Sequence, residues 1–272
     1  MRFARYALLP GIAAAFFLVL HAGAVPAIRA NRFQMRFEIF GFGGLHLLTD
    51  RTSVETGAAH YAIAMDLATR GLAGMFVSFA SHSEVHGRLV GGAARPEEYS
   101  GEIRRNGADQ QTRVDYGVDG TVLRAWTTPS PATVQATLVS ADQIRGTVDQ
   151  LTAYFIVERE LARRQSCAGV IPVFDGLNRY NLRFTDAPPE APPADIGRRF
   201  PGPMRVCEMS RQDIGGPADH GDGAYRGKIQ YARLPGGDRM VPVLMEFDTE
   251  LGRVKGYLAE LHGRDIDLRL MQ

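Results

Sequence analysis

His82, Glu84 and His86 have the residue types and the spacing that come closest to a metal site. They alternate along a segment that has the pattern of a β-strand, so their side chains share one face. Two imidazoles and a carboxylate are ligands that zinc accepts. The same alternation is typical of the solvated face of a half-buried strand, and we interpret the three residues in that way. We therefore expect no metal and no other cofactor.

Cys167 and Cys207 are the only cysteines, and 39 residues separate them. They form no C-x-x-C pair, so a thioredoxin-type redox site is not indicated. Neither cysteine stands in a recognisable nucleophile motif, which leaves a catalytic thiol as the weaker alternative. An isolated pair in an oxidising compartment predicts a disulfide.

Motifs of the common enzyme classes are absent from the sequence. It contains no G-x-S-x-G, no H-E-x-x-H and no G-x-x-x-x-G-K-[ST]. The glycine-rich segments fall where hairpin turns are expected, and turns explain them without a phosphate. We therefore expect a protein that is not an enzyme. Several aromatic residues can line an apolar cavity or fill a core, and the sequence leaves both open: Phe76, Phe79, Trp126, Tyr154 and Phe155.

The amino-terminal segment has the pattern of an export signal. Arg2 and Arg5 precede an apolar run over residues 7–20, and small residues follow it. We expect a signal peptide over residues 1–24, with cleavage as late as residue 30, and a periplasmic location. The alternative is an uncleaved anchor, but Pro10 and the shortness of the run disfavour a stable membrane span.

The charges argue against a nucleic-acid partner. Removal of residues 1–24 leaves 29 basic and 30 acidic side chains. A nearly neutral chain has no bulk electrostatic attraction to DNA or to anionic lipid. The remaining partners to consider are a lipid or a protein of the cell envelope.

The elements that must position these residues are mostly β-strands in a single domain over residues 31–272. Residues 33–40 alternate between apolar and polar, and Asn106-Gly107 has the signature of a type I′ hairpin turn. One amphipathic helix is predicted over residues 149–164, with Thr147 and Gln150 as its capping box. Six prolines predict an exposed loop over residues 187–203.

One stretch of the chain resembles a known family. Residues 173–182, V-F-D-G-L-N-R-Y-N-L, look like the V-F-D-G-x-x-R-Y-x-L signature of domain of unknown function 3108. Residues 147–152, the cysteine before the signature, and Gly202-Pro203 with Cys207 also fit. The resemblance implies an exported protein with the curved antiparallel half-barrel of the lipoprotein carriers LolA and LolB, wrapped around one helix. It supplies no catalytic residues, and we interpret the following motif residues as structural: Phe174, Asp175, Gly176, Arg179 and Tyr180.

These observations lead to three hypotheses of function. The first is a non-enzymatic periplasmic protein that binds an apolar ligand, a lipid or a lipoprotein, in envelope maintenance. The second is a structural module that docks on envelope proteins without a small ligand. The third is a hydrolase of envelope polymers, which needs a cleft with paired carboxylates or a metal.

Overall fold

The computed structural model describes residues 31–71, 74, 77–128, 139–200, 202–216, 225–234, 237, 239–249, 252–263 and 265–270. The expected signal segment and Phe76 lie outside these residues. No helix within the described ranges has the length and apolarity needed to cross a membrane.

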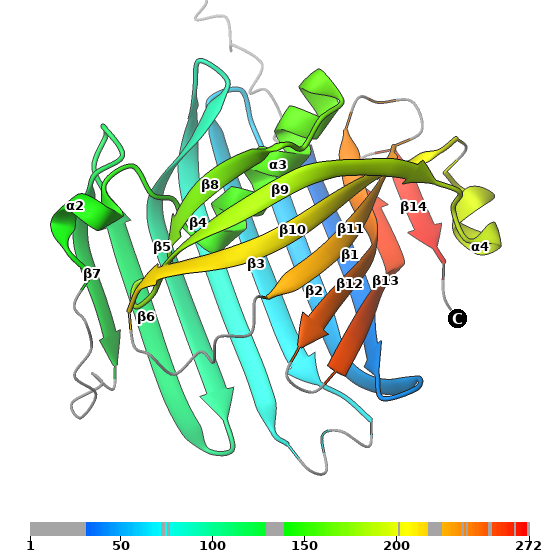
Figure 1. Cartoon of the computed structure of the whole chain (residues 1–272), viewed down its shortest axis with the longest axis horizontal. Helices are drawn as coiled ribbons and strands as arrows, with labels where there is room; N and C mark the ends of the chain where they lie inside the picture. The colour runs from blue at the N-terminus through cyan, green and yellow to red at the C-terminus, as the bar shows by residue number, and fades with distance from the viewer. Residues whose placement is uncertain are drawn as a thin grey trace, which may run out of the picture.

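The described residues form one antiparallel sheet of 14 strands (Figure 1). Its order is β7-β6-β5-β4-β3-β2-β1-β13-β12-β11-β10-β9-β8, and β14 pairs with β13 outside this path. The strands are β1 Asn31–Gly41, β2 Leu45–Thr56, β3 His60–Thr69, β4 Phe79–Val90, β5 Ala93–Arg105, β6 Ala108–Tyr116, β7 Val122–Thr128, β8 Gly169–Phe174, β9 Arg179–Glu190, β10 Met204–Gly215, β11 Arg226–Arg233, β12 Met240–Thr249, β13 Gly252–Gly263 and β14 Ile266–Arg269.

The sheet curves around helix α3, Gln150–Arg164. Figure 1 shows β8, β9 and β10 crossing in front of the long strands β3–β6, with α3 between the two layers. The helix contacts β4 and β5 on one side and β8 and β12 on the other. The prediction of a mostly β protein with a curved antiparallel sheet and one principal helix is thus confirmed. The described ranges add two helices of four residues each, α2 Ala141–Ile144 and α4 Ala194–Gly197.

Local sequence patterns explain these strands. Phe33, Met35 and Phe37 on β1 are buried, and the polar residues between them face the other side. Asn106 and Gly107 both have positive φ, +50° and +81°, and join β5 to β6 in the expected hairpin.

Helix α3 differs from its prediction in its amino-terminal cap and in how much of its surface is buried. Its amino-terminal cap is Asp149, whereas Thr147 donates its hydroxyl hydrogen to the Ile144 carbonyl, so the predicted capping box is wrong. Burial extends beyond one apolar stripe, because the sheet wraps around the helix and covers it from two sides. The buried side chains are Leu151, Thr152, Ala153, Phe155, Val157 and Leu161.

The proline-rich segment is not a continuous loop. Strand β9 runs through Pro188 and Pro189 to Glu190, and α4 follows, so the loop predicted over 187–203 is corrected. Strand β8 pairs with β9 only as far as Phe184. Beyond that point β9 has a free edge, where a proline without an N–H group costs no ladder hydrogen bond.

Two apolar clusters pack around α3. One contains Leu151 and Phe155 with residues of β1–β6, β8 and β10–β13. The other contains Ala153, Val157 and Leu161 with residues of β8–β12. The helix is therefore the centre of the hydrophobic core, and its two ends mark the places where polar groups meet that core.

Candidate functional site

A buried carboxyl lies at the amino end of α3. Asp149 has no exposed surface, and its Oδ1 accepts a hydrogen bond from the Thr152 backbone N–H at 2.8 Å. Its Oδ2 has no hydrogen-bond partner in the described part of the chain. Burial, which disfavours the charged form, raises the pKa of Asp149 to about 6.

Three buried tyrosines, from β3, β5 and β6, lie near enough to this carboxyl for its charge to act on them. The Tyr61 hydroxyl shares a 2.8 Å hydrogen bond with Thr152 Oγ1, and the Phe155 ring stacks on Tyr61 at 4.9 Å. The buried hydroxyl of Tyr116 has no partner among the described residues. Burial raises the pKa of Tyr61, Tyr99 and Tyr116, and the charge of Asp149 adds to each rise. All three hydroxyls therefore stay protonated at neutral pH.

Two glycines make room for these rings. A Cβ atom on Gly87, paired with Tyr61 across β3 and β4, would lie 2.5 Å from the Tyr61 ring. A Cβ atom on Gly101 would lie 3.2 Å from the Tyr99 hydroxyl. The missing side chains let the tyrosines lie along the sheet, beneath the first turn of α3.

The turn between β8 and β9 lies at one end of the strand order and packs against β6 and β7 at the other end. Asp175 Oδ1 accepts hydrogen bonds from the backbone N–H groups of Leu177 and Asn178 at 2.9 and 2.7 Å. The Thr127 hydroxyl donates to the Gly176 carbonyl at 3.5 Å, so the turn meets β7. Gly176 has φ +94°, and a Cβ atom there would overlap Thr112 Cγ2 on β6.

The other motif residues lie beside the same seam, the contact between the β8–β9 turn and strands β6 and β7. Phe174 and Tyr180 are buried, and the Phe174 N–H donates to the Val148 carbonyl at 2.9 Å. Arg179 Nε donates to the Gln143 carbonyl at 2.8 Å and so ties β9 to α2. Through these contacts the motif residues are held within the chain, and the β8–β9 turn packs against β6 and β7 without a strand ladder between them.

A cavity lies at the opposite, carboxyl end of α3. Its volume is about 210 Å³. Phe200, Ala232 and Met240 form an apolar floor, each no more than 4 % exposed. Arg205 on β10 and Arg233 on β11 also line it. The lining residues are Gln165, Phe200, Gly202, Pro203, Arg205, Ala232, Arg233 and Met240.

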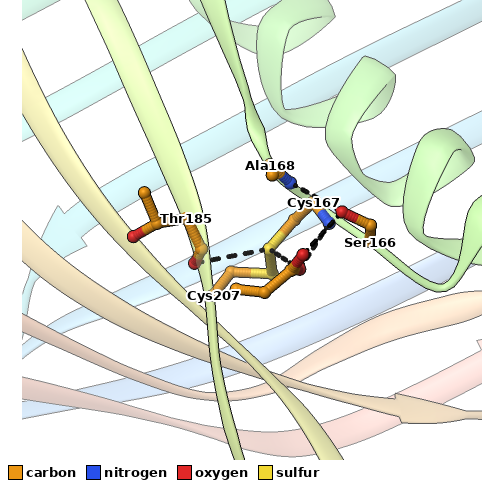
Figure 2. The surroundings of a disulfide bond; sticks show 6 residues. Ser166, Cys167, Ala168, Thr185 and Cys207 are labelled. Carbon is orange, nitrogen blue, oxygen red and sulfur yellow. Dashed lines mark hydrogen bonds between the residues drawn. A yellow bond between two sulfur atoms is a disulfide. The ribbon is translucent and has the colours of Figure 1, made fainter.

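The predicted disulfide is confirmed and lies beside this cavity. Cys167 and Cys207 are bonded, with Cα atoms 6.2 Å apart, and Figure 2 shows their surroundings. Asp186 Oδ1 accepts a hydrogen bond from the Cys167 N–H at 2.8 Å. Gln165 and Arg205 each precede one of these cysteines by two residues, and Arg205 Nη2 donates to Gln165 Oε1 at 3.2 Å. The disulfide thus fixes two segments that line the cavity.

The suggested zinc ligands are spread along the outer face of β4. His82 Nδ1 lies 2.8 Å from Asp66 Oδ1, and its Nε2 lies 3.8 Å from Glu84 Oε2. The hydrogen bond to Asp66 raises the pKa of His82. His86 is exposed. Within the described ranges, the one close group of three potential ligand atoms is Cys167, Asp186 and Cys207, and there the two sulfurs are bonded to each other.

The suggested cavity aromatics do not come together. Phe79 is partly buried at the start of β4, while Tyr154 and Phe155 lie on α3 inside the sheet. Trp126 is 39 % exposed and pairs with Arg113 on the outer face, so it does not line the interior. Val114 is buried, so its neighbour Arg113 and the paired Trp126 face outward. The sequence pattern of this segment did not assign Trp126 to either face of the sheet.

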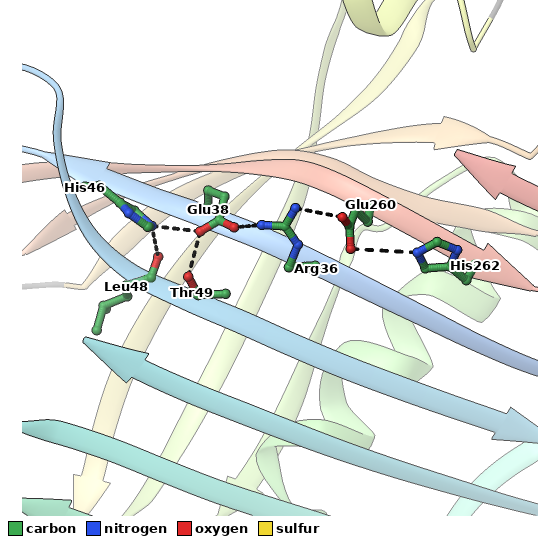
Figure 3. A network of polar contacts seen from close by, with 7 residues as sticks. All are labelled: Arg36, Glu38, His46, Leu48, Thr49, Glu260 and His262. Carbon is green, nitrogen blue, oxygen red and sulfur yellow. Dashed lines mark hydrogen bonds and ion pairs between the residues drawn. The ribbon is translucent and has the colours of Figure 1, made fainter. Parts of the chain in front are cut away.

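Sequence reasoning missed a polar network on the outer face of β1 (Figure 3). Glu38 is 8 % exposed and contacts Arg36, His46 Nε2 at 2.7 Å and the Thr49 hydroxyl at 2.7 Å. Arg36 Nη2 also donates to Glu260 Oε1 at 2.9 Å, which lowers the pKa of Glu260. The network links β2, β1 and β13. Its signal in the sequence was the polar side of β1, but the partners come from distant strands.

Comparison with known proteins defines the class of fold. No family model matches the chain, and no curated protein matches it. A solved structure that is similar is the β-barrel-like protein of domain of unknown function DUF1849 from Brucella abortus. The two share 11 % sequence identity with a TM-score of 0.51, over 88 % of this chain and 100 % of that one. This chain therefore has a β-barrel-like fold, and membership of the 3108 family is not confirmed.

Proposed function

We propose that this protein is a non-enzymatic binding protein for a lipid-type ligand, exported to the periplasm and acting in envelope maintenance. The observation that carries this proposal is the cavity at the carboxyl end of α3. Small-molecule sites are concave and mostly apolar, with a few placed polar groups. A floor of Phe200, Ala232 and Met240 beneath polar side chains has that composition.

Three further observations support the proposal. The disulfide suits an oxidising compartment. The amino-terminal thirty residues have the pattern of an export signal. A curved sheet around one helix is also the shape expected from a likeness to the LolA and LolB carriers, although a shared fold by itself does not establish a shared function.

Ligand retention and displacement test this function directly. Protein purified from the periplasm is analysed by native mass spectrometry, and binding of an apolar fluorescent probe is then measured with and without decanol as competitor. We expect a retained or displaceable ligand. The variant Ala232→Leu, which fills part of the floor, should bind the probe more weakly. Ala168→Leu, at an exposed position outside the cavity, is the matched control.

The result also separates the second hypothesis from the first. A docking module would bind neither probe nor lipid and would act through its surface, where Leu123 and Trp126 on the edge strand β7 are 70 % and 39 % exposed. A photo-crosslinker at position 123 that captured a protein, together with an empty cavity, would overturn the proposed lipid-type function.

Export is tested separately. Residues 1–30 are fused to a reporter enzyme that becomes active only outside the cytosol. We expect an active reporter, and an inactive one with the same residues after Arg2 and Arg5 are replaced by glutamate. An inactive reporter in the unchanged fusion would contradict the periplasmic location.

A further inference from the structure

We propose that Cys167, Cys207 and Asp186 form a zinc site when the disulfide is reduced, with two thiolates and one carboxylate as ligands. The site is separate from the proposed ligand function and uses none of the residues that line the cavity. While the disulfide is intact the two sulfurs are bonded to each other, so the ion and the S–S bond exclude one another. The same three side chains therefore have a disulfide state and a metal state.

The three ligand atoms are already close together. The two Sγ atoms and a carboxylate oxygen of Asp186 lie within 4.8 Å of one another. Cys167 Sγ is 3.2 Å from Asp186 Oδ1. With Zn–S and Zn–O bonds of about 2.3 and 2.0 Å, a tetrahedral ion holds a sulfur and an oxygen ligand roughly 3.5 Å apart. This pair therefore has nearly the required separation, and the main movement needed is that of the two sulfurs away from each other.

Strand pairing places Asp186 on the same side as Cys207. The two residues are direct partners in the ladder between β9 and β10, so their side chains leave the sheet on one face. Cys167 reaches the same place from the segment after α3, and its backbone N–H donates to Asp186 Oδ1 at 2.8 Å. These contacts are made by the ladder and by one N–H group, so they do not require the S–S bond.

Ser166 orients the carboxylate from outside the ligand set. Its hydroxyl donates to Asp186 Oδ2 at 2.6 Å, and Figure 2 shows Ser166 beside the bonded Cys167 and Cys207. Carboxylates that bind metals are commonly held by an outer hydrogen bond of this kind. A carboxylate oxygen has two lone pairs, so Oδ1 can keep its N–H partner and still bind an ion.

The ligand types favour zinc among the common metal ions. Calcium and magnesium take oxygen ligands and not thiolates, and a carboxylate is a poor ligand for the soft copper(I) ion. Zinc accepts both sulfur and carboxylate ligands and binds four in a tetrahedron. The fourth ligand is water from the side of Asp186, which is exposed, because Cys207 has no exposed surface. The ion also offsets three negative charges that would otherwise repel one another.

The change of state needs a reductant, and a dithiol supplies it. The dithiol transfers two electrons and two protons, so that the S–S bond breaks, Cys167 and Cys207 become thiols, and the reductant leaves as a disulfide. Zinc then forms two Zn–S bonds, and the two thiol protons pass to solvent. The metal state thus belongs to a reducing compartment and the disulfide state to an oxidising one.

Cobalt(II), which absorbs light strongly when thiolates bind it, is the probe that tests the site. The protein is reduced with a phosphine, which adds no competing thiol, and is titrated with cobalt(II) and then with zinc. We expect one cobalt ion per chain, with thiolate-to-metal absorption and the visible bands of tetrahedral coordination. Zinc should remove these bands by displacing cobalt. Protein with the disulfide intact should show none of them.

Variants assign the ligands. The double replacement Cys167→Ser and Cys207→Ser should abolish the thiolate absorption. Asp186→Asn should weaken zinc binding by about tenfold or more, and Ser166→Ala should weaken it by a smaller factor through the lost outer hydrogen bond. Glu208→Gln is the matched control, because Glu208 follows Cys207 on β10, is exposed and points to the other face of the strand. This control should bind zinc like the unchanged protein.

Circular dichroism checks folding in every sample. If the reduced protein loses its fold, zinc should restore the far-UV spectrum, because binding to the native ligand set stabilises the native state. Zinc that restored nothing would overturn the proposal. So would a reduced protein without thiolate bands, or equally tight binding with the disulfide intact. Unchanged zinc affinity of Asp186→Asn would refute the three-ligand set. None of these results alters the proposed lipid-type function, which is tested by probe binding.

Discussion

Replacement of Asp149 by asparagine should remove a pH-dependent part of the stability. The pKa of Asp149 is raised from 3.8 to about 6 by burial, so the folded state holds this proton more tightly than the unfolded state does. At about 1.36 kcal/mol for each pKa unit, the difference corresponds to about 3 kcal/mol. Since Asp149 has no exposed surface, solvent screening does not reduce this value.

The sign of the effect follows from the raised pKa. Below about pH 4 the carboxyl is protonated in both states and costs nothing. Between about pH 4 and pH 6 the unfolded state releases the proton while the folded state keeps it, so stability falls as pH rises. Above about pH 6 the full penalty is present. The side chain introduced by Asp149→Asn would still cap α3, because asparagine is as good a cap as aspartate.

Urea unfolding followed by far-UV circular dichroism, at intervals from pH 4 to pH 8, measures this effect. We expect Asp149→Asn to gain up to about 3 kcal/mol relative to the unchanged protein between pH 4 and pH 8. Other titrating groups cancel in that difference. Asp119→Asn is the control, because hydrogen bonds from Thr121 lower the pKa of Asp119 and any effect has the opposite sign. Parallel stability curves for Asp149→Asn and the unchanged protein would refute the reasoning.

Three further changes test the disulfide, the seam and the core. Replacing Cys167 and Cys207 by serine should cost about 4 kcal/mol by the chain-entropy model for a separation of 40 residues; an unchanged urea midpoint would contradict it. Gly176→Ala should destabilise the protein by more than Gly107→Ala, because both positions have positive φ but only at Gly176 does a Cβ atom overlap a neighbour; equal melting temperatures would show that the seam is not tight. Leu161→Ala, at a side chain with no exposed surface, should cost about 2–5 kcal/mol in urea unfolding, and a loss below about 1 kcal/mol would mean that the interior around α3 is loosely packed.

The elements that sequence reasoning predicted are those defined by local patterns. The alternation in β1, the Asn106-Gly107 turn and the helix over 149–164 each depend on neighbours within a few residues. The disulfide was predictable because only two cysteines exist. The prolines of β9 were misleading, because the free edge that tolerates them depends on where β8 ends.

The candidate sites depend on distant pairings and could not be predicted in the same way. Tyr61, Tyr99 and Tyr116 lie near Asp149 only because β3, β5 and β6 place them on one inner face. Arg205 and Arg233 line one cavity because β10 and β11 are neighbours. The spacing of these residues along the chain does not predict those contacts. Periodicity therefore predicts the strands but not how they assemble.

The pairing of the first strand with the second-last has a consequence for synthesis. Strand β1 lies between β2 and β13, and Arg36 and Glu260, which join them, are 224 positions apart. A ribosome must therefore finish nearly the whole polypeptide before β1 can have both neighbours. Folds dominated by such remote pairings form slowly. A nascent chain of this protein therefore cannot complete its sheet until late in synthesis, a state that the proposed export through a narrow channel would require.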